Sequence, residues 1–429
     1  MNNFIKKAEI WTPTGGGKAF VSGVHTKLIR EAASRRGVLI ERIDNKTYFL
    51  SHENKSVLFV EHLPALTSAT CRAASHDKNT TKIFLERAGV KTPMGSVFSP
   101  RAMDSALSYA QQIGFPVVIK PIRGSGGKGV ISDIQNEEHF KLAWTEAGST
   151  VRCIVEKHIY GRDYRVFVVN GRFVCAALRI PVNITGDGKS TVSELIQQKN
   201  KQREDNPYVG EKQIQISGEM LRNLQKLGFN KSSIIPAQMN IQLLPVANIG
   251  TGGDSKDVTD EVHPGFAEIA IKAAHSIPGA YFAGVDLLVP DISVSPDEQE
   301  YAVCEINTRC DIGLHHFPVF GPARDAAGAL IESIFPSAKP IRPITMKKVQ
   351  LTLQGQVIGV GMRQRIQRIA SLYHLKGWVR NEGRKVSALI CGSESAVDRA
   401  ILSLASSPST YVSSAEWLGT PPNNFEVIQ

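Results

Sequence analysis

The stretch FPVVIKPIRGSGGKGV, residues 115–130, constrains the fold of this chain more than any other segment. An apolar run ends at Lys120, and a glycine-rich loop separates it from a second apolar run. The loop is not a Walker A motif, because Gly129 stands where that motif needs Ser or Thr. It is not a dinucleotide fingerprint, because its glycines do not open a helix. Two strands joined by such a loop can close backbone N–H groups over phosphates, although an ordinary glycine-rich hairpin has the same pattern.

Composition places the chain among globular proteins. The 429 residues are 42% hydrophobic and 21% charged, and at roughly 100–200 residues per domain they predict two or three domains. No apolar run approaches the roughly 20 residues that span a bilayer, and the N-terminus has no apolar secretory segment. Six cysteines without a CxxC pair favour a reducing compartment. We therefore expect a cytoplasmic protein with no membrane partner.

The formal net charge of +10 raises the question of nucleic-acid binding. Proteins that bind nucleic acids often concentrate their charge in a basic block or interleave arginine with aromatic residues, and this sequence does neither. A small anionic substrate such as a nucleotide fits the charge better. We expect no nucleic-acid partner.

Apolar runs divide the chain into three structured parts and a linker. Residues 1–76 alternate short strands with one helix, which predicts a small α/β domain. Residues 77–337 form the largest part, and its polar stretch 186–240 is interpreted as a lid insertion. Prolines and basic residues in 338–348 indicate a linker. Residues 349–429 form the last part, which starts with a compact β-α-β-β-α-β pattern.

Two apolar segments carry oxygen-bearing side chains. Asp286 lies in the run AGVDLLVPDI, and Glu305 and Asn307 lie two apart in YAVCEINTR, so both project from one face of a strand. A solvated strand face is a weak explanation, because unpaired carboxylates on buried strands are costly. Two carboxylates and an amide oxygen suit Mg²⁺ bound between ATP phosphates, which gives three candidate metal ligands.

Together these features resemble the ATP-grasp superfamily of carboxylate–amine ligases, above all the ATP-grasp domains of cyanophycin synthetases and bifunctional glutathione synthetases. The resemblance covers roughly residues 25–337 and implies an ATP-grasp fold behind the small N-terminal α/β domain. Six stretches follow the family's order: DKNTTKIFLERAGVKTP (77–93), FPVVIKPIRGSGGKGV (115–130), VEKHIYGRDYRVFVVNGR (155–172), RIPVNITGDGKSTVSELI (179–196), ANIGTGGDSKDVTDEVHP (247–264) and EINTRCDIGLHHFPVFGPARDAAG (305–328).

The resemblance implies which residues bind the phosphates of ATP. Lys78 and Lys120 match the two lysines that hold the α- and β-phosphates, as point charges suit phosphate oxygens. Without the motif, Lys78 would read equally well as a surface lysine. Ser125, Gly126 and Gly127 match the flexible loop that caps the phosphates.

The same resemblance implies roles around the rest of the nucleotide. Glu156 and Lys157 match the hinge that binds adenine, and Asp163 matches the acidic residue on the ribose hydroxyls. Arg165 and Arg179 match arginines that face the acyl phosphate or the γ-phosphate, with rim salt bridges as the alternative. The family's metal ligands coincide with the three candidates above. The implied cofactors are ATP and two Mg²⁺ ions, for which Mn²⁺ is a substitute.

Amide-bond formation is the chemistry that the resemblance implies. A carboxylate is a poor electrophile, and phosphoryl transfer from ATP makes it an acyl phosphate from which an amine displaces phosphate. Such an enzyme mainly positions reactants and neutralises charge. The second ATPase domain of cyanophycin synthetase and the glutamate–cysteine ligase module of the glutathione enzymes have no counterpart here. We therefore expect an amino-acid or peptide carboxylate and an amine, without naming either.

The last part of the chain resembles acylphosphatase. The match is strong through GQVIGVGMR (355–363) and LKGWVRN (375–381), and it implies a ferredoxin-like α+β domain. In that family a loop wraps a phosphate at the N-terminus of the first helix, where the helix dipole favours anions. Arg363 matches the arginine that binds the phosphate, and Asn381 matches the residue that orients the attacking water.

Departures at Ile358 and Met362 leave two interpretations of this domain open. It hydrolyses acyl phosphates that escape from the ligase site, or it is a docking or substrate-recruiting module. For the whole chain, the leading hypothesis is an ATP- and Mg²⁺-dependent ligase. The alternative is an acylphosphatase-type hydrolase whose ATP-grasp domain senses nucleotide. A homodimer is compatible with either.

Overall fold

The computed structural model describes residues 23–428, except 45, 125, 205, 341–345, 373–374, 406–409, 418–421 and 423. The chain divides into two compact units, a larger one that runs to Lys339 and a smaller one from Pro340 onward. Within the described residues, no helix is long and apolar enough to cross a membrane.

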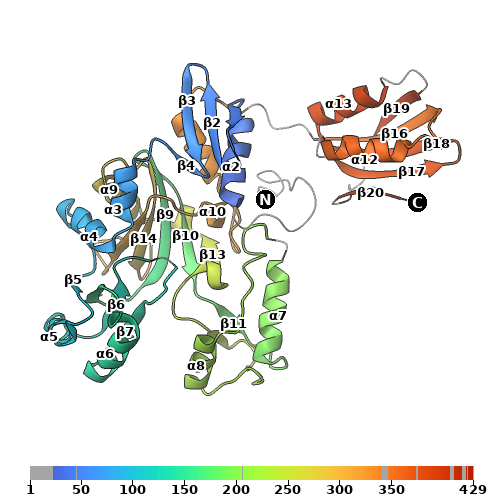
Figure 1. Ribbon diagram of the computed structural model, residues 1–429. Helices are drawn as coiled ribbons and strands as arrows, with labels where there is room; N and C mark the ends of the chain where they lie inside the picture. The colour runs from blue at the N-terminus through green and yellow to red at the C-terminus, as the bar shows by residue number, and fades with distance from the viewer. Residues whose placement is uncertain are drawn as a thin grey trace. The chain divides into compact units, whose positions relative to one another are not determined.

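The larger unit begins with one helix and a small antiparallel sheet (Figure 1). Leu28 and Ile29 of the helix are buried, and the stacked rings of Tyr48 and Phe59 lie 5.5 Å apart between neighbouring strands. The elements are α2 (Val24–Ser34), β1 (Leu39–Arg42), β2 (Thr47–His52), β3 (Lys55–Val60) and β4 (Leu63–Pro64).

A second layer holds the glycine-rich loop. Its sheet has the order β5-β8-β6-β7, and the loop joins β6 to β7 as the sequence predicts. The short edge strand β5 has no counterpart in the sequence analysis. The elements are α3 (Ala69–Ser75), α4 (Lys78–Arg87), β5 (Gly95–Phe98), α5 (Met103–Ile113), β6 (Val117–Pro121), β7 (Ile131–Ile134), α6 (Glu137–Ala143) and β8 (Cys153–Lys157).

The central sheet has the order β13-β10-β9-β14-β15 and is antiparallel throughout. The hairpin between β9 and β10 turns at Asn170 and Gly171, both with positive φ, as a tight turn requires. The elements are β9 (Arg162–Val169), β10 (Arg172–Ile180), β13 (Asp254–Asp257), α9 (Pro264–Ser276), β14 (Phe282–Val289) and β15 (Ala302–Asn307).

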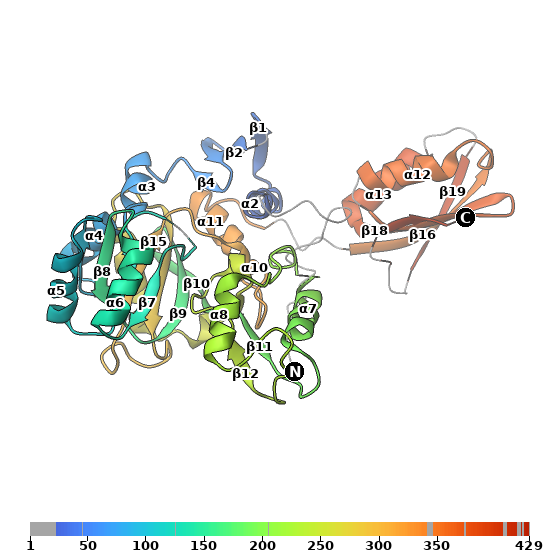
Figure 2. The same ribbon diagram turned by 60° about the horizontal axis from the view of Figure 1, so that its bottom comes forward.

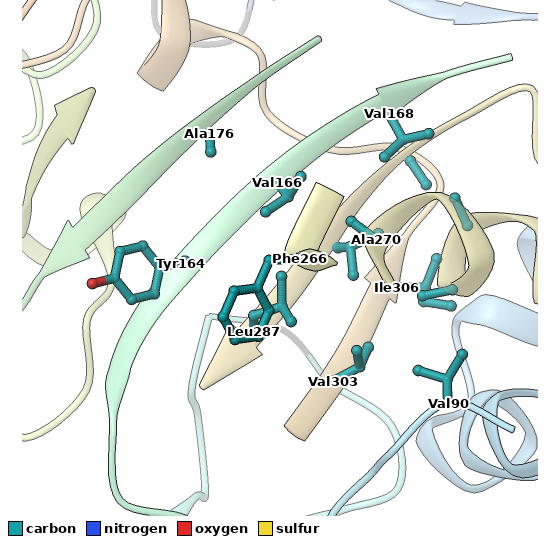
Figure 3. Packing of buried hydrophobic residues seen from close by; sticks show 14 of the residues in the cluster. Val90, Tyr164, Val166, Val168, Ala176, Phe266, Ala270, Leu287, Val303 and Ile306 are labelled. Carbon is teal, nitrogen blue, oxygen red and sulfur yellow. The ribbon is translucent and has the colours of Figure 1, made fainter. Parts of the chain in front are cut away.

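One face of this sheet packs on α9, and this packing determines which side chains point the other way. Figure 3 shows Phe266 and Ala270 of α9 among Val166, Leu287 and Ile306 of the strands. Burial of one such aromatic or aliphatic side chain stabilises the fold by roughly 1.5–3 kcal/mol. Because side chains alternate along a strand, the residues between these apolar positions face away from α9.

The segment between β10 and β13 (green in Figure 1), predicted to be a lid insertion, has a hydrophobic core of its own. A capping box between Thr191 and Glu194 begins its first helix, which satisfies N–H groups that the helix itself leaves unpaired. Its elements are β11 (Asn183–Thr185), α7 (Val192–Arg203), α8 (Gly218–Lys226) and β12 (Asn240–Gln242). Two further helices, α10 (Gly313–His316) and α11 (Ala326–Ile334), end the larger unit.

The smaller unit has the predicted β-α-β-β-α-β order, with both helices on one face of the sheet (Figure 2). The first strand begins at Met346, inside the predicted linker, and a further strand, β20, pairs in parallel with β17. The sheet order is β19-β16-β18-β17-β20. The elements are β16 (Met346–Gly355), α12 (Met362–Leu372), β17 (Lys376–Glu382), β18 (Lys385–Ser393), α13 (Glu394–Ala405), β19 (Thr410–Glu416) and β20 (Phe425–Val427).

Candidate active site

Two adjoining cavities of the larger unit collect most of the residues predicted from the sequence. The first has a volume of about 320 Å³, and the second, about 640 Å³, shares Lys120, Asp163 and Arg179 with it. Glu156 and Lys157 line only the second cavity. The predicted residues that line the first are Lys78, Lys120, Gly126, Gly127, Asp163, Arg165, Arg179, Asp286, Glu305 and Asn307.

The register of the central sheet aligns its charged residues across three strands. Asp286 of β14 pairs with Arg165 of β9 on one side and with Glu305 of β15 on the other. Cross-strand partners of this kind place their Cβ atoms about 4.5–5.5 Å apart, so their side chains meet. Asn307 follows two residues after Glu305 and therefore shares its face.

Arginines and carboxylates alternate along this charged row. Arg165 donates to both oxygens of Asp286, with Nη2 3.0 Å from Oδ2. Arg179 Nη2 lies 2.6 Å from Asp163 Oδ1 and 2.8 Å from Asp286 Oδ2, so it bridges the two carboxylates. The alternation lets buried charges compensate one another, without which their desolvation would be costly.

The two aspartates of the row have opposite pKa shifts. Burial alone would raise the pKa of Asp286, but the guanidinium groups of Arg165 and Arg179 hold it below its usual value. For Asp163, burial raises the pKa above its usual value despite the attraction of Arg179. For Asp286 the two arginines therefore outweigh the effect of burial on the pKa, whereas for Asp163 burial outweighs its arginine partner.

The predicted metal ligands form a set of oxygen donors. Glu305 Oε1 lies 3.7 Å from Lys78 Nζ, and Asn307 Nδ2 lies 3.5 Å from Asp286 Oδ2. Among the described residues, no three His, Cys, Asp or Glu side chains group as metal ligands. Two carboxylates and one amide still fit Mg²⁺, because that ion takes few protein oxygens and completes its shell with phosphates and water.

The predicted phosphate lysines have different partners. Lys78 Nζ donates to the carbonyl oxygen of Gly124 at 2.9 Å, which directs it toward the glycine-rich loop. Lys120 is buried, and its Nζ lies 2.5 Å from Glu156 Oε1. Burial opposes the charge of Lys120, but Glu156 outweighs that effect and raises the pKa of the ammonium. Both lysines therefore present positive charge to the first cavity.

The predicted adenine hinge lies in the second cavity, where its side chains have structural partners. The carboxylate of Glu156 lies between Lys120 and Lys82, the latter at 3.7 Å. The ammonium of Lys157 donates to the carbonyl oxygens of Gly114 and Phe115, at 2.9 and 3.1 Å. Both side chains thus stabilise the wall of the second cavity through contacts with neighbouring residues.

The described part of the glycine-rich loop is held against a second loop. Gly126 and Gly127 have φ values of +67° and +73°, which glycine adopts without strain. A Cβ on Gly127 would lie 2.7 Å from Val246, and Asn248 Nδ2 donates to the carbonyl oxygen of Gly126 at 2.8 Å. Ser125 lies outside the described residues.

The smaller unit brings Arg363 near the strand that carries Asn381. Arg363 lies in the first turn of α12, after a loop in which Gly359 and Gly361 have positive φ. Its Nη1 donates to the carbonyl oxygen of Ile428 at 3.4 Å, and the N–H of Ile428 donates to Val379 of β17. Ile428 therefore ties the arginine to β17.

Four residues of the first unit form a cluster that the sequence analysis does not predict. Asp311 Oδ1 lies 2.9 Å from His25 Nε2, and Asp311 Oδ2 accepts a hydrogen bond from the Tyr208 hydroxyl at 2.7 Å. Lys212 Nζ lies 3.2 Å from the centre of the Tyr208 ring. Tyr208, Lys212 and Asp311 line the first cavity. Of the four, only Asp311 lies in one of the six stretches that resemble the ATP-grasp family, EINTRCDIGLHHFPVFGPARDAAG (305–328).

Two family models match the chain. Residues 77–170 match the carbamoyl-phosphate synthase L chain, ATP binding domain, and residues 349–425 match acylphosphatase. The first match covers α4 through β9, and the second covers the smaller unit from β16 to β20.

Curated relatives and a solved structure are similar to more than half of the chain. Cyanophycin synthetase of Geminocystis herdmanii is 35% identical over 62% of this chain and 31% of its own. The glutathione biosynthesis bifunctional protein GshAB of Streptococcus mutans is 29% identical over 72% of this chain and 42% of its own. The crystal structure of a bifunctional glutathione synthetase from Pasteurella multocida gives a TM-score of 0.55 at 27% identity, covering 74% of this chain and 44% of that one.

The chain spans less than half the length of these relatives. Within that span, the family models, the relatives and the fold agree on what the two units are. The chain carries an ATP-grasp domain related to those of cyanophycin synthetases and bifunctional glutathione synthetases, followed by an acylphosphatase domain.

Proposed function

We propose that this chain is an ATP- and Mg²⁺-dependent ligase that joins an amino-acid or peptide carboxylate to an amine through an acyl phosphate. One observation carries the proposal: a single cavity is lined by cationic side chains, among them Lys78, Lys120, Arg165 and Arg179, and by the oxygen donors Asp286, Glu305 and Asn307. Phosphoryl transfer needs this combination, since its catalysis consists of positioning and charge neutralisation.

The lysines and arginines neutralise the anionic reactants. Lys78 and Lys120 meet the α- and β-phosphates, while Arg165 and Arg179 stabilise the charge on the transferred phosphoryl group and on the acyl phosphate. Because these groups are already held by their partners, little reorganisation accompanies the reaction. Asp286, Glu305 and Asn307 would hold Mg²⁺, which supplies Lewis-acid polarisation of the phosphoryl oxygens when bound.

The nucleotide base belongs in the larger cavity of this proposal. That cavity is mostly apolar at its Ile159, Leu178, Ile180 and Leu288 walls, as a site for a planar base requires. Asp163 and Arg179 line both cavities and lie where a ribose would join base to phosphates. Asp163 must exchange part of its contact with Arg179 for ribose hydroxyls.

The acylphosphatase domain supports a second activity, hydrolysis of acyl phosphates that leave the ligase site. Arg363 at a helix start, behind a glycine loop, is the observation that favours it. Among the described residues, no carboxylate lies within 4.0 Å of this guanidinium, so it is available to an anion.

ADP release tests the first proposal. The purified chain would be given ATP, Mg²⁺ and a panel of amino acids and dipeptides, singly and in pairs, with products weighed by mass spectrometry. We expect release that requires one pair and a product lighter than the sum by one water. Release with one acid and no coupled product would indicate activation followed by hydrolysis. No release with any pair would favour a nucleotide-sensing domain.

A further inference from the structure

The lid supplies a lysine to the reaction cavity that the proposed function leaves without a role. Lys212 lies between α7 and α8 and lines the same cavity as Asp286, Glu305 and Asn307. Among the described residues, no carboxylate lies within 4.0 Å of its Nζ. It therefore differs from Lys78 and Lys120, which both have a carboxylate partner.

The carboxylate that acts electrostatically on Lys212 already has other partners. Both oxygens of Asp311 are already engaged, one by His25 and one by the Tyr208 hydroxyl. Lys212 Nζ lies instead over the ring of Tyr208, 3.2 Å from its centre. An aromatic face favours the ammonium form, but it has no formal counter-charge to hold the proton as a carboxylate partner would.

Neighbouring elements hold this lysine in place. Arg203, at the end of α7, donates through Nη2 to the carbonyl oxygen of Lys212 at 3.2 Å. The same guanidinium bonds Asp254 Oδ1 at 2.7 Å and the carbonyl oxygen of Gly252. The lid segment that carries Lys212 is thus anchored to β13 of the central sheet, which gives the amine a defined position.

The charges around Lys212 come from several elements. The pKa of Lys212 is lowered to about 8, mainly by burial. The charge of Asp311 raises this pKa, and the charge of Arg203 lowers it. His25 lies behind Asp311. The other charged groups that line the cavity are the cations Lys78, Lys120, Arg123, Lys128, Arg165 and Arg179 and the carboxylates Asp163, Asp286 and Glu305. An unmodified lysine has a pKa near 10.4, so this one is neutral far more often at physiological pH.

We propose that Lys212 is the general base of the ligase, taking the proton that the acceptor amine loses as it attacks the acyl phosphate. This role rests on the proposed function. The amine nitrogen forms the C–N bond with its lone pair, the bond between the acyl carbon and the phosphate oxygen breaks, and inorganic phosphate leaves. Lys212 receives the proton on Nζ and releases it to water. No other reactant is needed.

Two variants separate this role from simple anion binding. Lys212→Arg keeps the positive charge but cannot accept a proton near neutral pH, and Lys212→Met keeps the stem without the amine. Loss of a general base costs about 10²–10⁴-fold in rate. We expect both variants to lose amide formation to that extent. Lys189→Met, on an exposed turn of the lid, is the control and should retain full activity.

Hydroxylamine distinguishes the base from the rest of the machinery. Its nitrogen is unprotonated at neutral pH, so it traps an acyl phosphate as a hydroxamate without a base. With ATP, Mg²⁺ and the panel acid that gives the fastest trapping, we expect wild type, Lys212→Met and Lys212→Arg to form hydroxamate at similar rates. We expect only wild type and Lys189→Met to form amide rapidly with the panel amine, at rates that rise through about pH 8.

Each other outcome overturns an identifiable claim. Full amide formation by Lys212→Arg would mean that the lysine binds an anion. Equal loss of hydroxamate and amide in Lys212→Met would mean a structural role. Absence of hydroxamate from wild type would overturn the proposed function, and the base role with it. Independently, the pH dependence of Lys212 acetylation by acetic anhydride, read by peptide mass spectrometry, should have its midpoint near 8, and a midpoint as high as that of Lys189 would exclude the role.

Discussion

The glycine-rich loop between β6 and β7 and the one before α12 differ in their electrostatic surroundings. The loop between β6 and β7 faces a cavity where Lys120, Arg165 and Arg179 are all paired with carboxylates. The loop before α12 faces Arg363, whose contact is a backbone carbonyl oxygen. Lys120, Arg165 and Arg179 of the first site thus form a balanced network with carboxylates before any ligand binds, whereas Arg363 of the second has no carboxylate partner among the described residues.

Because of this difference, mutations in the two sites should affect activity and folding stability differently. In a balanced buried network, removal of one member leaves its partners charged and unpaired, which costs more than the lost contact. Arg363 is half-exposed and has no ion-pair partner among the described residues, so its removal leaves no buried charge without a partner. Mutations of the first site should therefore damage both activity and folding, and mutations of the second should damage activity alone.

Asp286→Asn should give the largest effect. It leaves Arg165 and Arg179 buried beside a neutral amide, so we expect the free energy of unfolding to fall by about 3–5 kcal/mol. ADP release should fall by about 10³-fold, because charge stabilisation in the transition state is lost with it. Urea unfolding and coupled ADP assays measure the two. Asp260→Asn, at a carboxylate 79% exposed, is the control, and equal stability of the two variants would contradict the balanced network.

Arg363→Ala tests the opposite side of the comparison. We expect hydrolysis of benzoyl phosphate to fall by about 10²-fold or more, since the guanidinium is the cation of the loop. ADP release and amide formation should be unchanged, and the free energy of unfolding should change by less than about 1 kcal/mol.

Arg384→Ala, in the exposed turn between β17 and β18, is the matched control for Arg363→Ala. If the wild-type protein does not hydrolyse benzoyl phosphate, the hydrolase interpretation of this domain is wrong and the docking interpretation is favoured. Strong destabilisation by Arg363→Ala would show that the two loops do not differ as argued.

Acidification should also separate the two units. His62 and His315 of the larger unit are buried and neutral, and burial lowers their pKa values to about 4 and about 3. Below pH 6.5 these histidines bind protons in the unfolded chain but remain neutral in the folded unit. The stability that is present above pH 6.5 is therefore lost as pH falls toward 4. Each such histidine contributes up to about 1.4 kcal/mol per pH unit.

Pulsed proteolysis in urea at pH 7, 6 and 5, read by peptide mass spectrometry, would follow each unit separately. The larger unit should lose stability steeply, and the smaller one, whose sequence after Lys339 has a single histidine, should lose less. His315→Asn should reduce the pH dependence of the larger unit's free energy of unfolding by the contribution of one titrating proton. An unchanged slope in that variant would mean that His315 is not neutral in the folded state.

The sequence predicted the strands of the site better than their partners. Asp286, Glu305 and Asn307 could be placed because alternation along a strand is local. The pairing of Asp286 with Arg165 depends on the register between β14 and β9, which lie more than a hundred residues apart and leave no local signal. The predicted phosphate and metal residues therefore came together, while their mutual ion pairs went unpredicted.

Residues contributed from far along the chain were missed altogether. His25 and Tyr208 meet at Asp311 although α2, the lid and the segment after β15 share no sequence motif. Strands β5 and β20 were missed because edge strands of three or four residues carry too little periodicity to be recognised. In both cases only the tertiary fold supplies the neighbours that define the feature.

Asp187 of the lid should give the smallest effect and sharpen the comparison of charge environments. Like Asp286 it has a lowered pKa, about 2, but it is fully exposed and owes the shift to hydrogen bonds from Ser190 and Lys189. Asp187→Asn should slightly reduce hydrogen-exchange protection of the lid at pH 7. That difference should vanish between about pH 4 and pH 2, because the wild-type carboxylate then takes up its proton. ADP release should be unchanged, since no buried cation loses its partner. A loss of activity like that of Asp286→Asn would mean that the lid turn, and not the buried row alone, controls the site.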